Sequence, residues 1–298
     1  MNLQPGATLD EEILNRWIGN IREHRDTIDL RQANLLRATL EPDQADFKTG
    51  DQLPDGWHWV YFAEPVNINE LGQDGHAARG GFLPPVALPK RMWAGVRLKF
   101  HQPIIIGEEV VKKSEVKRIT RKTGRSGELC FVTVNHKIYS GSTLKLEEDH
   151  DIVYRGTTPS RDMKIALPAA PGHSDCQITI NPSPILLFRY SALTFNSHRI
   201  HYDLDYCRNV EGYPGLVLHA PLVVNLMLGL ARSRFSGRNV TFSEFNQESI
   251  YPLYHDNPFV LHFKMEPGHC QIWATNSDQR LAARATLTVS QECAPENR

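Results

Sequence analysis

The sequence lacks features that define several large classes of protein. Its five cysteines are widely spaced, the nearest two being Cys270 and Cys293, so no CxxC metal or redox pair occurs. An odd, sparse set of cysteines is typical of a reducing compartment, and a cytoplasmic location is therefore expected. Lys and Arg number 33 against 34 Asp and Glu, a balance that argues against a general nucleic-acid-binding protein.

Charged residues are missing from one long stretch, residues 212–231, which approaches the length of a membrane span. Two prolines, a histidine and an asparagine interrupt it, so we interpret it as part of a buried helix over residues 213–235. Residues 1–12 have neither a basic start nor an apolar core, unlike a signal peptide. No membrane association is expected.

Several catalytic motifs are also absent. There is no GxGxxG, GxxxxGK[ST], GxSxG or HExxH motif, so nicotinamide, ATP, serine-hydrolase and zinc-protease chemistries have no anchor in the sequence. The chain of 298 residues is 41% hydrophobic, which is typical of a globular protein. At roughly 150 residues per domain, its length indicates about two domains.

Two helices are predicted near the beginning of the chain. Thr8 and Glu11 fit a capping box, and the apolar stripe that follows reaches Ile21, which predicts one long helix. A second helix is predicted over residues 31–40, because apolar residues recur there and Pro42 ends the pattern.

The rest of the first half is predicted to be loop and strand. Residues 57–62 read as a short strand, and residues 64–92 contain so many prolines and glycines that an ordered loop is expected. Strand-like runs then follow one another as far as Arg155, with a hairpin turn over residues 123–127.

The second half repeats this plan, with a helix followed by a run of strands. Residues 156–182 are rich in Pro, Gly, Ser and Ala and mark the boundary. We predict an N-terminal half over residues 1–160, a linker over 161–180 and a C-terminal half over 181–298. The predicted class is α+β, with two antiparallel sheets, each wrapping a central helix, joined into one extended sheet.

Polar residues are most concentrated in the second half at Asn196, His198, Arg199, His201, Asp203 and Asp205. Three interpretations stay open. A histidine can take a proton from a water molecule that the Asn196 amide holds. Alternatively, His198, His201 and Asp203 bind a metal ion, or the histidines only brace a polar loop.

Two further features each allow two interpretations. His219 and Ala220 lie early in the uncharged helix, where an unpaired backbone N–H stabilises an oxyanion if it faces a carbonyl; otherwise this is a plain core helix. A basic cluster either protects a solvated sheet face or binds the phosphates of a nucleotide-tailed ligand. The cluster contains Lys112, Lys113, Lys117, Arg118, Arg121, Lys122 and Arg125.

Two segments of the second half, TFNSHRIHYD and EGYPGLVLHAPL, resemble the MaoC-like double hot-dog hydratases and dehydratases. GGFLPPVALPKRMWAGVRLKFHQPI in the first half is similar to the matching segment of that superfamily. Within it, the chain is most similar to the mesaconyl-C4-CoA and itaconyl-CoA hydratases, and the mitochondrial-type hydroxyacyl-thioester dehydratases share the same loop. The resemblance implies a double hot-dog fold and an acyl-thioester substrate.

The resemblance also implies roles for individual residues. His201 matches the catalytic histidine of the family, and Asn196 stands where the family has an aspartate. An amide is no base, so either His201 acts as both base and acid or Asp203 contributes. The family's histidine-glycine pair falls on His219 and Ala220, which makes the Ala220 N–H the expected oxyanion donor.

The implied reaction is hydration of a branched C5 dicarboxylic acyl-CoA to citramalyl-CoA. His198 and Asp203 are candidate substrate contacts, and Arg199, Arg91 and Arg189 are candidates for binding the free carboxylate. No metal or redox cofactor is implied, CoA being only part of the substrate, and a homodimer is expected. The alternatives are a hydratase or dehydratase of straight-chain thioesters and a non-catalytic acyl-CoA-binding module.

Overall fold

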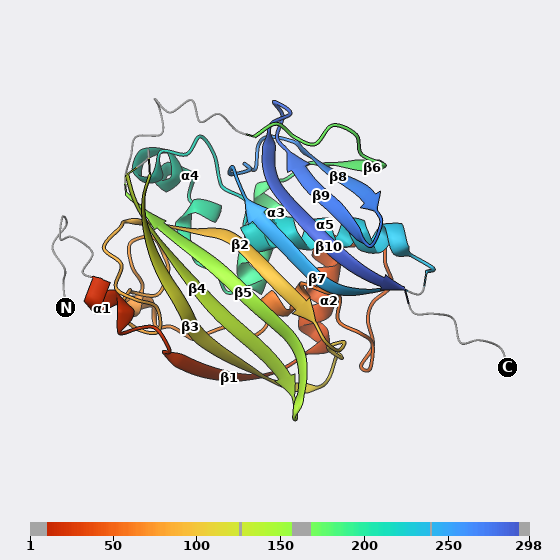
Figure 1. Ribbon diagram of the computed structural model, residues 1–298, viewed down its shortest axis with the longest axis horizontal. Coiled ribbons are helices and arrows are strands. Elements are labelled where there is room, and N and C mark those ends of the chain that lie inside the picture. Colours follow the sequence, from red (N-terminus) through yellow and green to blue (C-terminus); the bar gives the residue numbers. More distant parts are fainter. Residues whose placement is uncertain (1–10, 125–126, 157–167, 239, 292–298) are drawn as a thin grey trace.

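The computed structural model describes residues 11–124, 127–156, 168–238 and 240–291. Within these residues the strands form one ten-stranded antiparallel sheet in the order β1-β3-β4-β5-β2-β7-β10-β9-β8-β6. The first five positions hold the strands of the first half, and the last five hold those of the second half in mirrored order. The sheet therefore consists of two equivalent five-stranded units (Figure 1).

The described part of the first half contributes five strands, of which the last four are long and follow one another closely in the sequence. They are β1 (Ile21–Thr27), β2 (Lys90–Phe100), β3 (Glu109–Gly124), β4 (Gly127–Ser140) and β5 (Thr143–Arg155). The predicted hairpin between β3 and β4 has its central residues, 125 and 126, outside the described residues.

The second half has the same order of strands. They are β6 (Cys176–Ile180), β7 (Val240–Ser249), β8 (Phe259–Glu266), β9 (His269–Thr275) and β10 (Leu281–Gln291). The two halves join where β2 pairs with β7, with Gly95 opposite Glu248 and Lys99 opposite Glu244. A Cβ atom at Gly95 would lie 2.4 Å from the backbone oxygen of Gln247, so only glycine fits at this junction.

Helices and helical turns precede β2 in the first half and β7 in the second half. In the first half they are α1 (Glu11–Asn15), α2 (Leu30–Leu40) and two 3-10 turns (Trp57–Val60 and Ile68–Glu70). In the second half they are α3 (Pro184–Leu193), a 3-10 turn (Arg199–His201), α4 (Leu204–Tyr206), a π-helical turn (Cys207–Glu211) and α5 (Ala220–Phe235).

The main hydrophobic core surrounds α5, which lies across the second-half sheet (Figure 1). Leu222, Met227 and Leu228 on this helix are fully buried against strand residues such as Phe245 and Leu261. A smaller core, which includes Val132 and Tyr154, lies under the far edge of the first half. No helix of the described residues is long and apolar enough to cross a membrane.

The predicted runs of strands in the two halves and the double hot-dog arrangement are confirmed, as is the helix over residues 31–40. Three local predictions are wrong. The first helix ends at Asn15, and the residues from Ile21 form the edge strand β1, in which every residue after Ile21 is charged or polar. Residues 57–60 form a 3-10 turn instead of a strand, started by Gly56 in the left-handed conformation.

The uncharged helix is also shorter than predicted. It begins at Ala220 rather than at residue 213, because the chain from Tyr213 to His219 pairs with other segments: Val217 N–H donates to Ile200 O, and Leu218 N–H donates to Leu253 O. The second half starts with β6, which falls inside the predicted linker. Residues 161–167 of that linker, the preceding residues 157–160 and Thr8 of the predicted capping box lie outside the described residues.

Candidate active site

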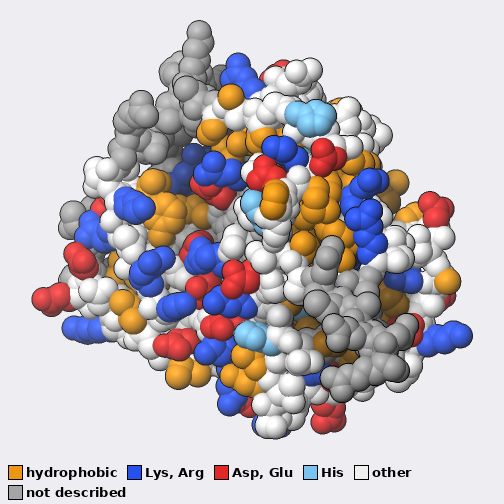
Figure 2. Space-filling view, turned by 45° about the vertical axis from the view of Figure 1, so that its right-hand side comes forward, with side chains coloured by type: hydrophobic (Ala, Val, Ile, Leu, Met, Phe, Trp, Pro, Cys, Tyr) orange, Lys and Arg blue, Asp and Glu red, His pale blue; other side chains and the backbone are white. Residues whose placement is uncertain are grey.

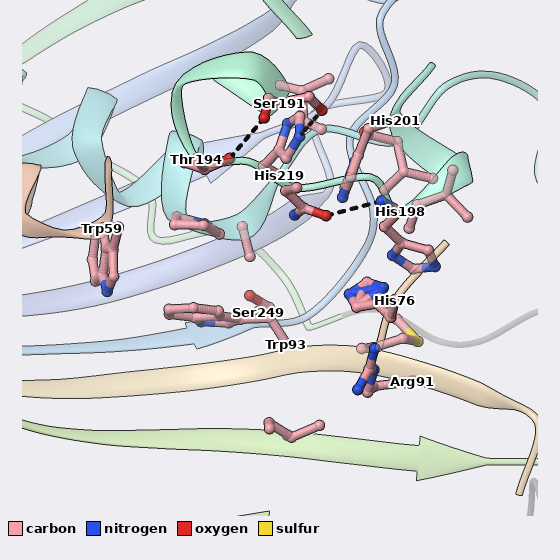
Figure 3. Close-up of a pocket in the computed structure, with 18 of the residues that line it drawn as sticks. Trp59, His76, Arg91, Trp93, Ser191, Thr194, His198, His201, His219 and Ser249 are labelled. Carbon is pink, nitrogen blue, oxygen red and sulfur yellow. Dashed lines mark hydrogen bonds between the residues drawn. The ribbon is translucent and has the colours of Figure 1, made fainter. Parts of the chain in front are cut away.

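A large cavity of about 1230 Å³ is lined by both halves of the protein. Figure 3 shows His201, His219 and His198 on one wall, with Trp93, Ser249 and Arg91 on the sheet opposite. Ligand pockets commonly measure roughly 300–1,000 Å³, so this cavity has room for a short acyl group and part of a longer carrier. Asn196 and Ala220 belong to the same lining.

The loop after α3 folds Asn196 into this cavity. Ser183 caps α3 by accepting from the Leu186 N–H at 3.2 Å, and Phe195 then takes a positive φ of 50° that turns the chain. The Asn196 side-chain oxygen accepts from the backbone N–H of His198 at 3.0 Å. The carbonyl end of this amide is thereby occupied, which leaves its NH₂ group to face the cavity.

His201 is held in one tautomer. Its Nδ1 lies 2.7 Å from the carbonyl oxygen of Val217, and because a carbonyl only accepts, Nδ1 carries the proton. The other nitrogen, Nε2, is then an unprotonated acceptor. Burial lowers the pKa of His201 to about 4, so the imidazole is neutral at physiological pH and available to accept a proton.

His219 packs directly against His201. The two rings stack with centroids 3.6 Å apart and planes 19° from parallel, and His219 Nε2 lies 2.8 Å from Ser191 Oγ. Burial, followed by the neighbouring His201, holds the pKa of His219 well below its usual value. Two neutral imidazoles therefore form a flat wall, which the Ser191 hydroxyl holds in place.

Helix α5 begins directly after this wall. His219 is its N-cap residue and makes no side-chain capping hydrogen bond, and Pro occupies one of the first helical positions. Ala220, the first helical residue, belongs to the turn whose N–H groups have no intrahelical acceptor. Because Ala220 lines the cavity, its N–H and the partial positive charge of the helix terminus are available to a carbonyl oxygen there.

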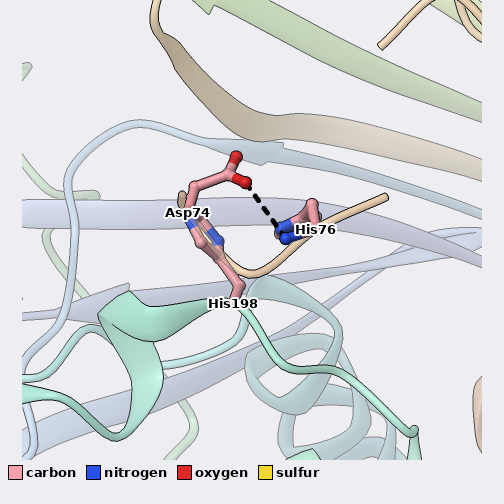
Figure 4. A group of neighbouring side chains, drawn as sticks. All are labelled: Asp74, His76 and His198. Atoms are coloured by element: carbon pink, nitrogen blue, oxygen red, sulfur yellow. Dashed lines mark hydrogen bonds between the residues drawn. The ribbon is translucent and has the colours of Figure 1, made fainter. Parts of the chain in front are cut away.

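One residue of this cavity that was not predicted is His76, which comes from the first half, and Asp74 lies beside it outside the lining. The His76 ring meets that of His198 edge-on at 4.1 Å, and His198 meets His201 at 5.4 Å. Figure 4 shows Asp74, His76 and His198 grouped together, with Asp74 accepting from the backbone N–H of His76 at 3.0 Å. The sequence did contain an indication of His76, because this histidine follows Gly75 in a loop rich in glycine.

The loop that carries these two residues is bound to the loop that carries the histidines. Arg199 N–H donates to Asp74 O at 2.9 Å, and Ser197 Oγ donates to Gly75 O. A Cβ atom at Gly75, whose φ is +86°, would lie 1.9 Å from the backbone oxygen of Ser197. Only glycine therefore permits this close approach between the two halves.

The predicted substrate-binding residues divide into two groups. His198 and Arg91 line the cavity. Arg199 and Asp203 do not: they form an ion pair at 2.7 Å on the outer side of the loop, and Asp203 also caps α4. Arg189 donates to the backbone oxygen of Ala38 at 3.3 Å and is not part of the lining either.

The proposed metal-binding set His198, His201 and Asp203 is not brought together, because Asp203 faces Arg199 instead. Two other groups of described residues do place ligand atoms within 4.8 Å of one another. One is Asp74, His76 and His198; the other is His136, Glu148 and His150 in the first half.

Three residues of the basic cluster on β3, Lys113, Lys117 and Arg121, pair with acidic residues. Lys117 lies 2.8 Å from Asp149, and Arg121 pairs with Glu128. Figure 2 likewise shows Lys and Arg side chains intermixed with Asp and Glu over one face of the molecule. Lys112 is different because it lines the cavity, 4.8 Å from the Phe62 ring centroid. Arg125 lies outside the described residues.

The chain is similar to a known protein family and to individual characterised proteins. The family described as "Hydroxyacyl-thioester dehydratase type 2" matches residues 56–255. The mesaconyl-C(4)-CoA hydratase of Chloroflexus aurantiacus is 43% identical over 275 residues, which cover 92% of this chain and 96% of that protein. The mitochondrial hydroxyacyl-thioester dehydratase type 2 of Schizosaccharomyces pombe is 29% identical and covers 69% of this chain and 76% of its own length.

Solved structures share the fold at low sequence identity. A MaoC-like dehydratase superimposes with a TM-score of 0.69 at 14% identity, covering 94% of this chain and all of that one. A Mycobacterium tuberculosis protein described as having a double hotdog fold gives 0.57 at 13% identity, with 92% and 96% of the two chains covered. These likenesses identify the architecture as a double hot-dog fold.

Proposed function

Since the chain belongs to the hydroxyacyl-thioester dehydratase type 2 family, we propose that it is a hydro-lyase that adds water to an α,β-unsaturated acyl-CoA. The observation that carries this proposal is the shared cavity, onto which a neutral histidine and the first N–H of α5 both open. Hydration of an enoyl thioester needs these two aids, a base for the water and a donor for the carbonyl oxygen.

The reaction begins with a water molecule between Asn196 and His201. The free NH₂ of Asn196 donates to the water oxygen, and His201 Nε2 takes one of its protons. The hydroxide oxygen bonds to the β-carbon, and the electron pair of the double bond moves onto the thioester oxygen. The fixed Nδ1–H bond to Val217 keeps the imidazole oriented while it carries a positive charge.

The negative charge that reaches the thioester oxygen is stabilised by α5. The Ala220 N–H and the helix terminus provide a fixed donor where this charge develops. Because the donor belongs to a buried helix, it need not reorganise during the reaction. The charge then returns to the α-carbon, which takes back the proton from the His201 imidazolium, and the product is a 3-hydroxyacyl-CoA.

Asp203 has no part in this proposal. It does not line the cavity and is bound to Arg199 and to the backbone of α4. His201 therefore acts first as the base and then as the acid, with Asn196 orienting the water. This chemistry uses no metal or redox cofactor, and CoA enters only as part of the substrate.

We propose a branched C5 dicarboxylic acyl-CoA, mesaconyl-C4-CoA or itaconyl-CoA, as the substrate and citramalyl-CoA as the product. The double bond of mesaconyl-C4-CoA is conjugated with the thioester and takes up water directly. In itaconyl-CoA the double bond joins the β-carbon to the methylene carbon, so it first shifts to the α,β-position as the α-carbon loses a proton and the methylene carbon gains one. The similar Chloroflexus protein is named for the first of these thioesters. Of the three arginines considered for the free carboxylate, only Arg91 lines the cavity. A homodimer and a cytoplasmic location are proposed from the resemblance and the cysteine content only.

The test is a substrate panel with the purified full chain. Mesaconyl-C4-CoA, itaconyl-CoA and crotonyl-CoA are each incubated with the protein, and the mass gain of one water is followed over time. We expect kcat/KM for mesaconyl-C4-CoA to exceed that for crotonyl-CoA at least tenfold. A preference for crotonyl-CoA supports the straight-chain alternative, whereas binding without turnover of any thioester supports a non-catalytic module.

A further inference from the structure

Two nitrogen-bearing side chains of the first half, Arg91 and His76, line the cavity. Their Nε and Nδ1 atoms are shielded from solvent and have no hydrogen-bond partner among the described residues. A partly buried guanidinium without an acidic partner favours an anion in the cavity that it lines. Because an arginine donates only, the ligand must offer acceptor atoms.

The two side chains are neighbours on the same side of the cavity. Figure 3 shows His76 beside Arg91, with His198 next to them. After burial, the charge of Arg91 is the largest influence that lowers the pKa of His76, which agrees with this closeness. A carboxylate in the cavity can therefore lie against both side chains.

Arg91 differs from the cations around it, which already have acidic partners. In the same strand, Lys90 lies 3.5 Å from Glu211 and Arg97 lies 2.5 Å from Asp151. Among the described residues, Arg91 has no carboxylate within 4.0 Å. Its charge is therefore available to an anion that enters the cavity.

The chemistry of the proposed substrate places an anion at this position. In mesaconyl-C4-CoA the free carboxylate is attached to the β-carbon, the same atom that the hydroxide attacks. When the β-carbon lies beside His201, the carboxylate lies one bond further away. The His198 ring lies 5.4 Å from that of His201, and the His76 ring lies 4.1 Å from that of His198, so a carboxylate on the His198 side of the β-carbon approaches His76.

The loop around His76 is held rigidly enough to position a ligand. Gly75 packs against the backbone of Ser197, and Arg199 N–H donates to Asp74 O at 2.9 Å. On the other side, Arg79 donates to the carbonyl oxygens of Val86 and Pro89, each at 2.6 Å, directly before β2, the strand that holds Arg91. Both donors therefore stand on fixed backbone.

We infer that His76, a residue of the first half, is a specificity residue that binds the free carboxylate of the substrate together with Arg91. This inference rests on the proposed function and names the group that selects the dicarboxylic thioester. Asp74 and His198 beside His76 also offer ligand atoms to a cation. The neighbouring guanidinium of Arg91 opposes a cation there, and the Asp74 carboxylate opposes an anion within the cluster, so the substrate carboxylate belongs on the Arg91 side of His76.

The test compares His76→Phe and His76→Gln with the wild-type full chain on mesaconyl-C4-CoA and crotonyl-CoA. Crotonyl-CoA has a hydrogen where the other substrate has its carboxylate. The quantity compared is kcat/KM for mesaconyl-C4-CoA divided by kcat/KM for crotonyl-CoA. We expect His76→Phe to lower this ratio about 100-fold, mostly by raising the KM for mesaconyl-C4-CoA. His76→Gln, which keeps an N–H donor, recovers at least tenfold of this loss.

The matched control is His262→Phe, the same exchange at an imidazole that stacks on Trp273 outside the cavity lining. We expect it to leave the ratio within twofold. An unchanged ratio in His76→Phe overturns the inference, because the residue then only supports the loop. Activity that EDTA removes and Zn²⁺ restores also overturns it. If the wild type hydrates neither thioester, the proposed function itself fails.

Discussion

The two halves of the sheet have the same strand order but different covers. In the second half, the 16-residue helix α5 fills the inner face of the sheet with apolar side chains. In the first half, the corresponding connection between α2 and β2 consists of turns and a long loop, residues 41–89. On the first-half side the cavity is lined by these turns and loops, with residues such as Trp59, Phe62 and His76, and on the second-half side by the start of α5.

The inner faces of the two halves of the sheet also differ: that of the second half is apolar, and that of the first half carries a buried polar cluster. Strands β8 and β9 present buried apolar residues, such as Leu261 and Ile272, to α5. At the inner face of the first half, Glu148 is buried and accepts from His58 Nε2 at 3.0 Å and from Trp59 Nε1 at 3.2 Å. We interpret this polar cluster as structural and the histidines of the second half as catalytic.

The largest expected effect is the loss of activity in His201→Ala. Without the imidazole no group of the second half takes the proton of water, and kcat should fall about 10³- to 10⁴-fold. The measurement is turnover of mesaconyl-C4-CoA, with the melting temperature as the control for folding. Activity within tenfold of wild type in a folded variant would show that the base lies elsewhere.

Glu148→Ala should instead cost stability. It leaves the His58 and Trp59 donors without their acceptor inside the first half, and we expect the free energy of unfolding to fall by about 3–5 kcal/mol. Leu261→Ala is the matched change in the second half, with an expected loss of about 2–5 kcal/mol. Denaturant titration measures both.

If the polar cluster is structural, the folded Glu148→Ala protein keeps kcat/KM within about threefold of wild type. A collapse of turnover at unchanged stability would move part of the chemistry into the first half and contradict the comparison.

Acid should destabilise both halves, because each buries neutral histidines. Burial lowers the pKa of His150 in the first half and of His201 in the second half to about 4. The unfolded chain binds these protons from about pH 6.5 downward, so stability is full above that pH and falls as pH drops towards 4. Each imidazole contributes up to about 1.4 kcal/mol per pH unit.

The measurement is the free energy of unfolding between pH 4 and 7 for the wild type, His150→Phe and His201→Ala. Each variant should lower the slope of the unfolding free energy against pH by up to about 1.4 kcal/mol per pH unit, which is the contribution of one bound proton. An identical slope in wild type and both variants would mean that neither histidine is kept neutral by burial.

The smallest effect is expected for Asp203→Asn, outside the cavity. The ion pair with Arg199 is exposed and screened by water, so it contributes little to stability, and asparagine still caps α4. Turnover should stay within threefold of wild type. A loss of 100-fold or more would restore Asp203 as the acidic partner of His201.

The sequence was sufficient to predict the long strands, because alternation and turn residues are local signals. The edge strands β1 and β6 were missed: β1 carries charged residues on a strand with one exposed side, and β6 lies in a segment of loop composition. Helix α3 was also missed, although Ser183 followed by Pro184 is a typical helix start.

The candidate site was predictable where it is local in the chain. Asn196, His201 and Ala220 fall within one segment, and the cavity brings them together. His76 was missed because its contact with His198 joins loops of different halves, and no local pattern encodes such a contact. Three arginines were equal candidates in the sequence, since the direction of a long side chain depends on tertiary packing.

The most direct test of the central claim is Ala220→Pro, which removes the proposed oxyanion donor. Proline is favourable at the first position of a helix, so α5 and the melting temperature should be preserved. We predict that kcat for mesaconyl-C4-CoA falls about 10²- to 10³-fold while the Kd of the thioester changes little. A folded Ala220→Pro protein with wild-type kcat would contradict the account.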